Sequence, residues 1–369
     1  MGHPTEAVMS AELVAHFPPT FPGKKFRVAT NFHTVSPCSQ LAASGVGWEL
    51  EEVWSVVPRT QMTYALFCKK PAGRIYSNMA EVCLAQHDAT DVDVFLAEVG
   101  TSTVTEYAAY IHCKQPHCVA FVSTPPKYDF SKKLCLAMEN VSAVAAKQYT
   151  LEEHVYDAAV FGYPLHEVTL VTVVSKSVGV LDELDSFRAS ECQSLPYLLG
   201  LVPRTYTQGW AMLQDAERGH KKDKDQQAAY IKHINSKKHD GALPPSFQDA
   251  PLSCSLRGFR AAQAQVGEYW RKRHDASIAV MLADAVGGTV HVGGSMVPYS
   301  GRSAVLYVSE GSAKILTPLD LFAVRGYSCH NYNLALGTFA KASTLAGKIV
   351  PARLLLAILL AAAIASESA

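Results

Sequence analysis

The chain has 369 residues, of which 49% are apolar and 18% are charged, and its 33 basic residues are balanced by 33 acidic ones. This balance of charges excludes a general attraction to polyanions or membrane surfaces. The length of the chain suffices for two domains or for one large domain. Because typical soluble domains are roughly 25% charged, the low charge predicts that much of the surface is buried in the core or against partners.

Nine cysteines are scattered without the regular spacing of a disulfide framework. An odd count on a long chain excludes a disulfide scaffold. The first six residues, Met1 to Glu6, have neither the basic nor the apolar part of a secretory leader. We therefore expect a reducing compartment: the cytoplasm, or a virion assembled there.

The first half of the chain predicts a mixture of short strands and helices. Turn residues separate short apolar runs throughout residues 1–75, which is typical of strands and loops. The elements expected next are a helix from Ser77 to His87, strands at Asp91–Val99 and His117–Ser123, a helix within Asp129–Gln148, a helix from Thr150 toward Phe161, a strand at Val168–Val174 and a helix around Asp182–Cys192. The helix at Thr150 is expected because Thr150 and Glu153 have the spacing of a capping box.

The second half predicts longer helices. A polar, lysine-rich stretch spans residues 207–239. It is followed by a predicted helix at Leu256–Ala285, a flexible hairpin or a hinged arm at Gly287–Gly294, a strand at Ser303–Ser309 and a helix at Leu334–Ala365 that Pro351 interrupts. The fold class is therefore mixed α+β, with short strands and loops in the N-terminal part and long helices in the C-terminal part. We expect a mixed α/β domain at residues 1–203 and a mainly helical domain at residues 204–369.

The segment Leu354–Ala365 is apolar on every side. Twelve helical residues rise about 18 Å, which is too short for the roughly 30 Å hydrocarbon core of a membrane. Such a helix is buried in its own domain or docked on a neighbouring subunit, and a tail anchor is a third alternative. We predict no membrane partner.

The sequence carries none of the short motifs that identify an enzyme. The nucleophile elbow, the phosphate-binding P-loop and the dinucleotide fingerprint are each incomplete: Gly45-Val46-Gly47, for example, has Leu50 in place of the third glycine. These absences remove the easily recognised enzymes but not enzymes as a class. We predict no cofactor.

One cluster offers ligands for a metal, namely His112, Cys113, His117 and Cys118. Structural zinc needs four converging ligands, and neighbouring residues on a strand diverge, so a buried thiol with solvent-facing imidazoles is the alternative. Cys113 or Cys118 could also be a nucleophile activated by His154 or His166. Asp91 and Asp93 share a strand face and are a second candidate metal site, or a solvated edge.

Basic residues are concentrated between Arg218 and His274. This segment holds twelve Lys or Arg against five Asp or Glu, an excess of +7, and the rest of the chain therefore carries −7. Basic side chains with interleaved aromatic rings suit a phosphate backbone and its bases. The predicted nucleic-acid contacts are Lys221, Lys222, Lys224, Tyr269, Trp270, Arg271, Lys272 and Arg273. A solvated face or an acidic protein partner are the alternatives.

Taken together, these features favour a self-assembling structural protein of the viral capsid or nucleocapsid type, a homo-oligomer whose basic segment contacts RNA or another nucleic acid. Low charge, an apolar C-terminal segment and a glycine-rich arm are typical of large assemblies. The alternatives are an α/β enzyme without a local motif, acting as a Cys/His hydrolase or transferase, and a non-catalytic subunit of a ribonucleoprotein.

Overall fold

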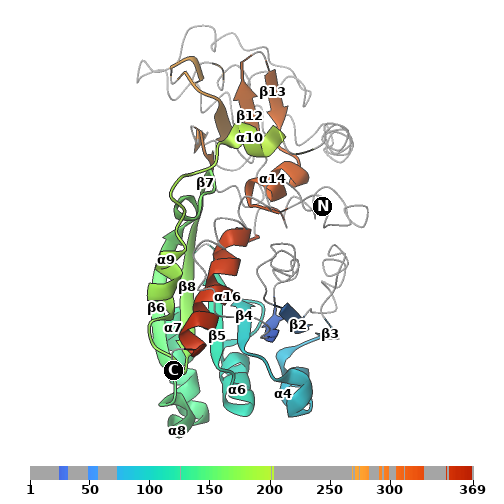
Figure 1. The fold of residues 1–369 in the computed structure, drawn as a ribbon, viewed down its shortest axis with the longest axis vertical. Coiled ribbons are helices and arrows are strands. Elements are labelled where there is room, and N and C mark those ends of the chain that lie inside the picture. Colours follow the sequence, from blue (N-terminus) through green and yellow to red (C-terminus); the bar gives the residue numbers. More distant parts are fainter. Residues whose placement is uncertain are drawn as a thin grey trace, which may run out of the picture.

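The computed structural model describes residues 25–31, 49–56, 73–124, 126–200, 202, 268, 271–273, 275–281, 291–292, 295–298, 305–310, 312–327, 346 and 349–367. They form a seven-stranded sheet, a four-stranded sheet and one two-stranded pairing, with helices packed on the largest sheet (Figure 1). None of the helices in these ranges is long and apolar enough to cross a membrane.

The large sheet has the strand order β3-β2-β1-β4-β5-β8-β6. Its strands are β1 (Lys25–Thr30), β2 (Glu49–Val56), β3 (Arg74–Tyr76), β4 (Val94–Glu98), β5 (Cys118–Ser123), β6 (Thr150–Asp157) and β8 (Val168–Ser175). The first five pair in parallel, whereas β8 is antiparallel to both β5 and β6. The fold is therefore mixed α/β with a mostly parallel sheet.

Helices cover both faces of this sheet, because a parallel sheet must bury both. Alternate residues of one strand enter different cores: Phe95 and Phe121 pack on one face, and Leu96 and Val122 on the other. The first face is covered by α4 (Met79–Leu84), α6 (Val104–Lys114), α7 (Phe130–Val141) and α8 (Ala143–Ala146), and the second by α9 (Val180–Ser186) and α16 (Ala352–Glu367). Figure 1 shows α16 lying across β4 and β5.

The apolar C-terminal helix α16 is a core element of its own chain. Every side chain from Leu354 to Ala363 is buried, and the helix packs against α9 and against the sheet. This confirms the interpretation of the segment as a core helix. The alternative, docking on a neighbouring subunit, is not needed to cover its surface.

A second, smaller sheet follows in the C-terminal part, with the order β10-β9-β12-β13 and antiparallel pairing. Its strands are β9 (Ile278–Met281), β10 (His291–Val292), β12 (Val305–Ser309) and β13 (Ser312–Ile315). A short strand, β11 (Val297–Pro298), pairs in parallel with β7 (Leu165–His166). The remaining elements are α5 (His87–Thr90), the 3₁₀ turn η2 (Ala158–Phe161), α10 (Leu195–Gly200) and α14 (Pro318–Val324).

Four predicted strands are confirmed as β4, β5, β8 and β12. The helix predicted within Asp129–Gln148 is present as two pieces, α7 and α8, which meet at Ser142. The helices predicted from Ser77 and around Asp182 are present but shorter, as α4 and α9.

The helix predicted from Thr150 is wrong, because this segment is the edge strand β6. The Thr150 hydroxyl donates to the carbonyls of Ser175 and Ser177 at 3.0 and 2.9 Å rather than capping a helix. The Glu153 carboxylate accepts the Thr172 hydroxyl at 3.1 Å. Pairing along the whole of β8 outweighs the local capping pattern.

The predicted layout, with long helices in the C-terminal part, is not confirmed. The end of the helix expected at Leu256–Ala285 is strand β9, in which Ile278 and Ala279 are fully buried. The expected arm at Gly287–Gly294 contains β10, and its other residues lie outside the described ranges, as do residues 207–239. The domain boundary at residue 203 stays a prediction.

A buried ion pair joins the end of α14 to the start of β8. Arg325 Nη2 lies 2.7 Å from Glu167 Oε2, and the two side chains are 1% and 0% exposed. Burial raises the pKa of Glu167, and Arg325 opposes this increase. Among the described residues, Glu167 Oε1 and Arg325 Nε have no further hydrogen-bond partner.

Removing one member of this pair should be costly, because the other charge is left buried alone. We expect Arg325→Met or Glu167→Gln to lower the free energy of unfolding by about 3–5 kcal/mol, and the double variant Glu167→Leu/Arg325→Met to recover most of the loss. In Arg325→Met the pKa of Glu167 should rise further. A folded-state pKa above the unfolded value stabilises at acidic pH, so this variant should lose stability as the pH rises.

Urea unfolding at several pH values measures these changes. The control is Asp185→Asn, which breaks the exposed Asp185–Arg188 pair and should change stability by at most about 1 kcal/mol. A loss in Arg325→Met no larger than in this control would contradict the prediction.

Candidate ligand-binding site

The strand order places a switch point beside β1. The chain runs from β1 outward to β2 and β3 on one side, and continues at β4 and β5 on the other side. The strands that follow β1 and β4 in the sequence thus lie on opposite sides, and open α/β sheets bind ligands at such a switch point. The residues that follow β1 and β4 form the candidate site.

Asn31, the residue directly after β1, is fully buried and uses its whole side chain in hydrogen bonds. Its carbonyl accepts the backbone N–H of Glu98 at 2.5 Å. Its amide donates to Thr101 Oγ1 at 2.5 Å and to the Tyr107 hydroxyl at 2.7 Å. One side chain thus ties the end of β1 to the turn that follows β4.

Tyr107 and Thr101 complete this cluster. Both hydroxyls donate to the Glu98 carbonyl, at 3.0 Å from Tyr107 and 2.6 Å from Thr101. Burial raises the pKa of Tyr107, so its phenol stays protonated at neutral pH and acts as a hydrogen-bond donor rather than a base. We call Asn31, Thr101 and Tyr107 the switch-point cluster.

The start of α6 is fixed at the same edge of the sheet. Thr103 and Glu106 form a capping box, in which the Thr103 backbone N–H donates to the Glu106 carboxylate at 2.7 Å. Gly100 turns the chain with a φ of 104°, which favours glycine. The Lys127 ammonium donates to the Val99 carbonyl at 3.3 Å beside this turn.

A carboxylate lies beside the last residue of β1. Glu52 Oε1, on the neighbouring strand β2, accepts the Thr30 hydroxyl at 3.0 Å. Glu52 is in the middle of β2 and pairs with Val28. The donors of the cluster are engaged within the protein, so the cluster supports the edge of the sheet at which a ligand would bind.

The predicted metal ligands do not converge. His112 and Cys113 are exposed on α6, whereas Cys118 is fully buried in β5 and burial raises the pKa of its thiol to about 12. The His117 ring lies 2.8 Å from the Ser177 hydroxyl. Within the described ranges there is no group of three or more His, Cys, Asp or Glu side chains that could hold a metal ion.

The structure does not bring Cys118 together with either candidate histidine. Cys118 pairs with Ser175 at the last residue of β8, whereas His166 lies before the first. Seven residue steps along a strand span about 23 Å. His154 pairs with Val171, four steps from Ser175, or about 13 Å.

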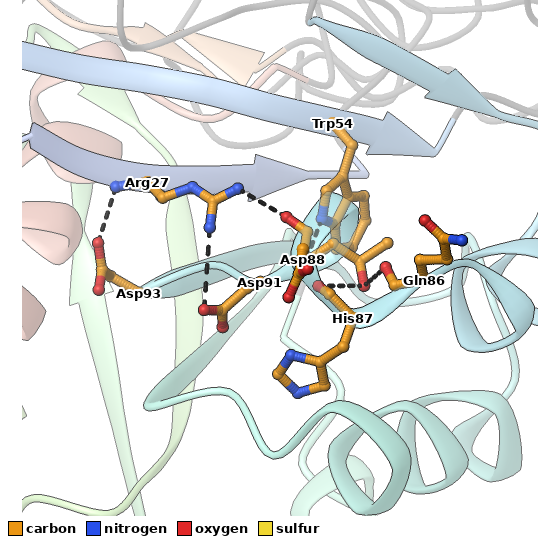
Figure 2. Close-up of polar contacts among 8 residues, drawn as sticks. Arg27, Trp54, Gln86, His87, Asp88, Asp91 and Asp93 are labelled. Carbon is orange, nitrogen blue, oxygen red and sulfur yellow. Dashed lines mark hydrogen bonds and ion pairs between the residues drawn. The ribbon is translucent and has the colours of Figure 1, made fainter.

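Asp91 and Asp93 lie at the amino edge of the sheet, away from the switch-point cluster. Figure 2 shows both carboxylates directed at Arg27: Asp93 accepts its backbone N–H at 2.8 Å, and Asp91 lies 3.8 Å from its guanidinium. The guanidinium also donates to the Asp88 carbonyl at 3.2 Å. These contacts anchor α5 to β1, and the two aspartates are structural.

Most of the predicted nucleic-acid contacts lie outside the described residues, and only Arg271, Lys272 and Arg273 can be placed. Both oxygens of the Glu268 carboxylate accept from Arg271 at 2.8 Å. This bidentate bond lowers the pKa of Glu268. Lys272 lies 3.8 Å from the same carboxylate. The Arg271 guanidinium is therefore already bound to a carboxylate of its own chain, where the prediction placed a nucleic-acid phosphate.

No protein-family model matches the sequence, and no curated protein matches it either. Solved structures do match over nearly the whole chain. The S. pombe Dnmt2 methyltransferase matches with a TM-score of 0.47 and 11% identity, over 93% of this chain and 99% of its own. A putative DNA modification methyltransferase encoded in an E. coli prophage matches with a TM-score of 0.48 and 13% identity, over 93% and 99%. Spodoptera frugiperda DNMT2 matches with a TM-score of 0.46 and 10% identity, over 91% and 99%.

The prediction of a viral capsid or nucleocapsid-like structural protein is wrong. The described residues form a mostly parallel seven-stranded sheet with helices on both faces, which is an architecture of many α/β enzymes. The alternative, an α/β enzyme without a local motif, fits better. Self-association, RNA binding and a cytoplasmic location stay predictions.

The switch-point cluster should contribute to stability. Tyr107→Phe removes the hydroxyl that accepts a hydrogen bond from the buried Asn31 amide. Because that amide proton then has no acceptor, we expect the free energy of unfolding to fall by about 1–3 kcal/mol. Tyr128→Phe is the matched control, because Tyr128 is 67% exposed, and it should change stability by less than about 0.5 kcal/mol. Equal stabilities of the two variants in urea would refute the role of the cluster.

If the basic segment binds single-stranded nucleic acid through six phosphate contacts, the logarithm of the affinity should fall with the logarithm of salt concentration at a slope of roughly −4. Replacing Lys221, Lys222 and Lys224 by Gln should flatten the slope by about 2. Arg271→Gln should change it less, since its guanidinium is engaged by Glu268. Fluorescence anisotropy with a labelled oligonucleotide measures the slope, and a salt-independent affinity would eliminate this hypothesis.

Proposed function

We propose that this chain is an α/β transferase that binds a nucleoside-containing methyl donor, S-adenosylmethionine, in the crevice beside the switch-point cluster. The observation that carries the proposal is the strand order, with its change of direction at β1 and a cluster of buried hydrogen-bonding groups at that point. The general position of ligands in open α/β sheets supports this location.

The connection after β1 argues against a dinucleotide as the ligand. Sites for a diphosphate place glycines directly after the first strand, so that the backbone can approach the phosphates. Here the first glycine after Thr30 is Gly45, and the position next to the strand is occupied by Asn31. A nucleoside ligand without a diphosphate does not require that loop, and S-adenosylmethionine is such a ligand.

The carboxylate beside Thr30 also supports this ligand class. A carboxylate can accept hydrogen bonds from the ribose hydroxyls of a nucleoside, and Glu52 Oε1 lies 3.0 Å from the Thr30 hydroxyl. When bound, this donor supplies an activated methyl group, and the residues of this chain bind and orient it.

Calorimetric titration of the full chain with S-adenosylmethionine, NAD⁺ and ATP tests the proposal. We expect binding of S-adenosylmethionine and no measurable binding of the other two. Asn31→Ala should weaken that binding by about tenfold, or about 1.4 kcal/mol, because the turn after β4 loses its attachment to β1. Asn140→Ala is the matched control, since Asn140 is exposed on α7, and should leave the affinity unchanged.

Tighter binding of NAD⁺ or ATP than of S-adenosylmethionine would reject the ligand class. Equal affinities of the Asn31→Ala and Asn140→Ala variants would reject the location. Circular dichroism of both variants establishes that a loss of binding is not a loss of folding.

A further inference from the structure

The end of α4 and the end of α6 bring two thiols together. Cys83 lies in the last turn of α4, Cys113 lies in the last turn of α6, and the two helices pack side by side on the same face of the sheet. The Lys114 ammonium, next to Cys113, donates to the carbonyl of Ala85, directly after α4, at 2.6 Å. This contact holds the end of α6 beside the end of α4, and the neighbouring Cys113 contributes to the pKa of Cys83. Neither cysteine is part of a disulfide bond.

The two thiols differ in their surroundings. Cys113 is exposed, whereas Cys83 is half-buried. Burial, followed by the neighbouring Cys113, raises the pKa of Cys83 to about 11, and Lys114 opposes this increase. An oxidant from solvent therefore meets Cys113 first, with Cys83 directly behind it.

The other described cysteines lie on other elements. Cys118 is fully buried, and Cys135 and Cys192 are exposed on α7 and near the start of α10. The pair at Cys83 and Cys113 is thus the place, within the described residues, where two thiols can react with each other without moving a helix across the sheet.

We propose that Cys83 and Cys113 are a redox modification site, which forms an intramolecular disulfide in the presence of a small disulfide oxidant such as oxidised glutathione. The Cys113 thiolate attacks one glutathione sulfur, and one reduced glutathione leaves. The Cys83 thiolate then attacks Cys113 Sγ of the mixed disulfide, and the second reduced glutathione leaves. Two protein thiols are oxidised to one disulfide and one glutathione disulfide is reduced to two thiols, so atoms and electrons balance.

This order of steps predicts the pH dependence of ring closure. The attacking species is the thiolate, and its fraction at Cys83 rises about tenfold for each pH unit below its pKa. Closure of the mixed disulfide should therefore become about 100-fold faster between pH 7 and pH 9.

The experiment treats the full chain with oxidised glutathione, blocks the remaining thiols with an alkylating reagent and maps the peptides by mass spectrometry. We expect a linked peptide pair that contains Cys83 and Cys113, and glutathione adducts at Cys135 and Cys192. In Cys83→Ala the glutathione adduct should persist at Cys113, and in Cys113→Ser the Cys83 thiol should stay reduced. Cys135→Ser and Cys192→Ser are the matched controls and should leave the linked pair unchanged.

A stable glutathione adduct at Cys113 of the unmodified sequence, with Cys83 still reduced, would overturn the proposal. A linked peptide that joins Cys83 or Cys113 to any other cysteine would overturn it as well. Thermal melting of each variant checks the fold. Because Cys113 is exposed, the Cys113→Ser variant keeps the test available even where Cys83→Ala unfolds.

Discussion

The need to bury both faces of a parallel sheet governs this structure. Strands β4 and β5 alternate their side chains between two cores, so neither face can be left to solvent. One face is covered by helices that follow the strands directly, and the other is completed by α16, which is far away in the sequence. The C-terminal helix is apolar on every side because α9, the sheet and the preceding C-terminal elements all pack against it.

The same constraint determines where polar groups can gather. Inside the sheet every position of β5 is buried, so hydrogen-bonding side chains can be used for a ligand only where strands end. Asn31 lies at such a point, where its side-chain carbonyl accepts a hydrogen bond from the backbone N–H of Glu98 at the end of β4. Its buried hydrogen bonds hold the end of β1 against the turn that follows β4, which gives this edge of the sheet a rigid support.

The sequence predicted the strands whose burial is continuous, because an apolar run such as Val168–Ser175 has few alternatives to a central strand. It failed where tertiary pairing competes with a local pattern: Thr150 and Glu153 have the spacing of a helix cap, but the partner strand provides more hydrogen bonds than a cap does. The switch-point cluster was missed because Asn31 and Tyr107 are 76 residues apart. The one available signal was a polar residue directly after an apolar strand.

The two edges of the large sheet explain why a strand-rich, weakly charged chain need not assemble. Unpaired edges invite pairing with other chains, and proteins limit this with short strands, charges and covering segments. At one edge, β3 has only three residues. At the other, β6 carries Glu152, Glu153 and His154. The Glu152 carboxylate accepts the backbone N–H groups of Gly179 and Leu181 at 2.7 and 3.0 Å, and it thereby fixes the start of α9 against this strand. Two acidic side chains, Glu152 and Glu153, are thus placed at the edge where a strand from another chain would otherwise add.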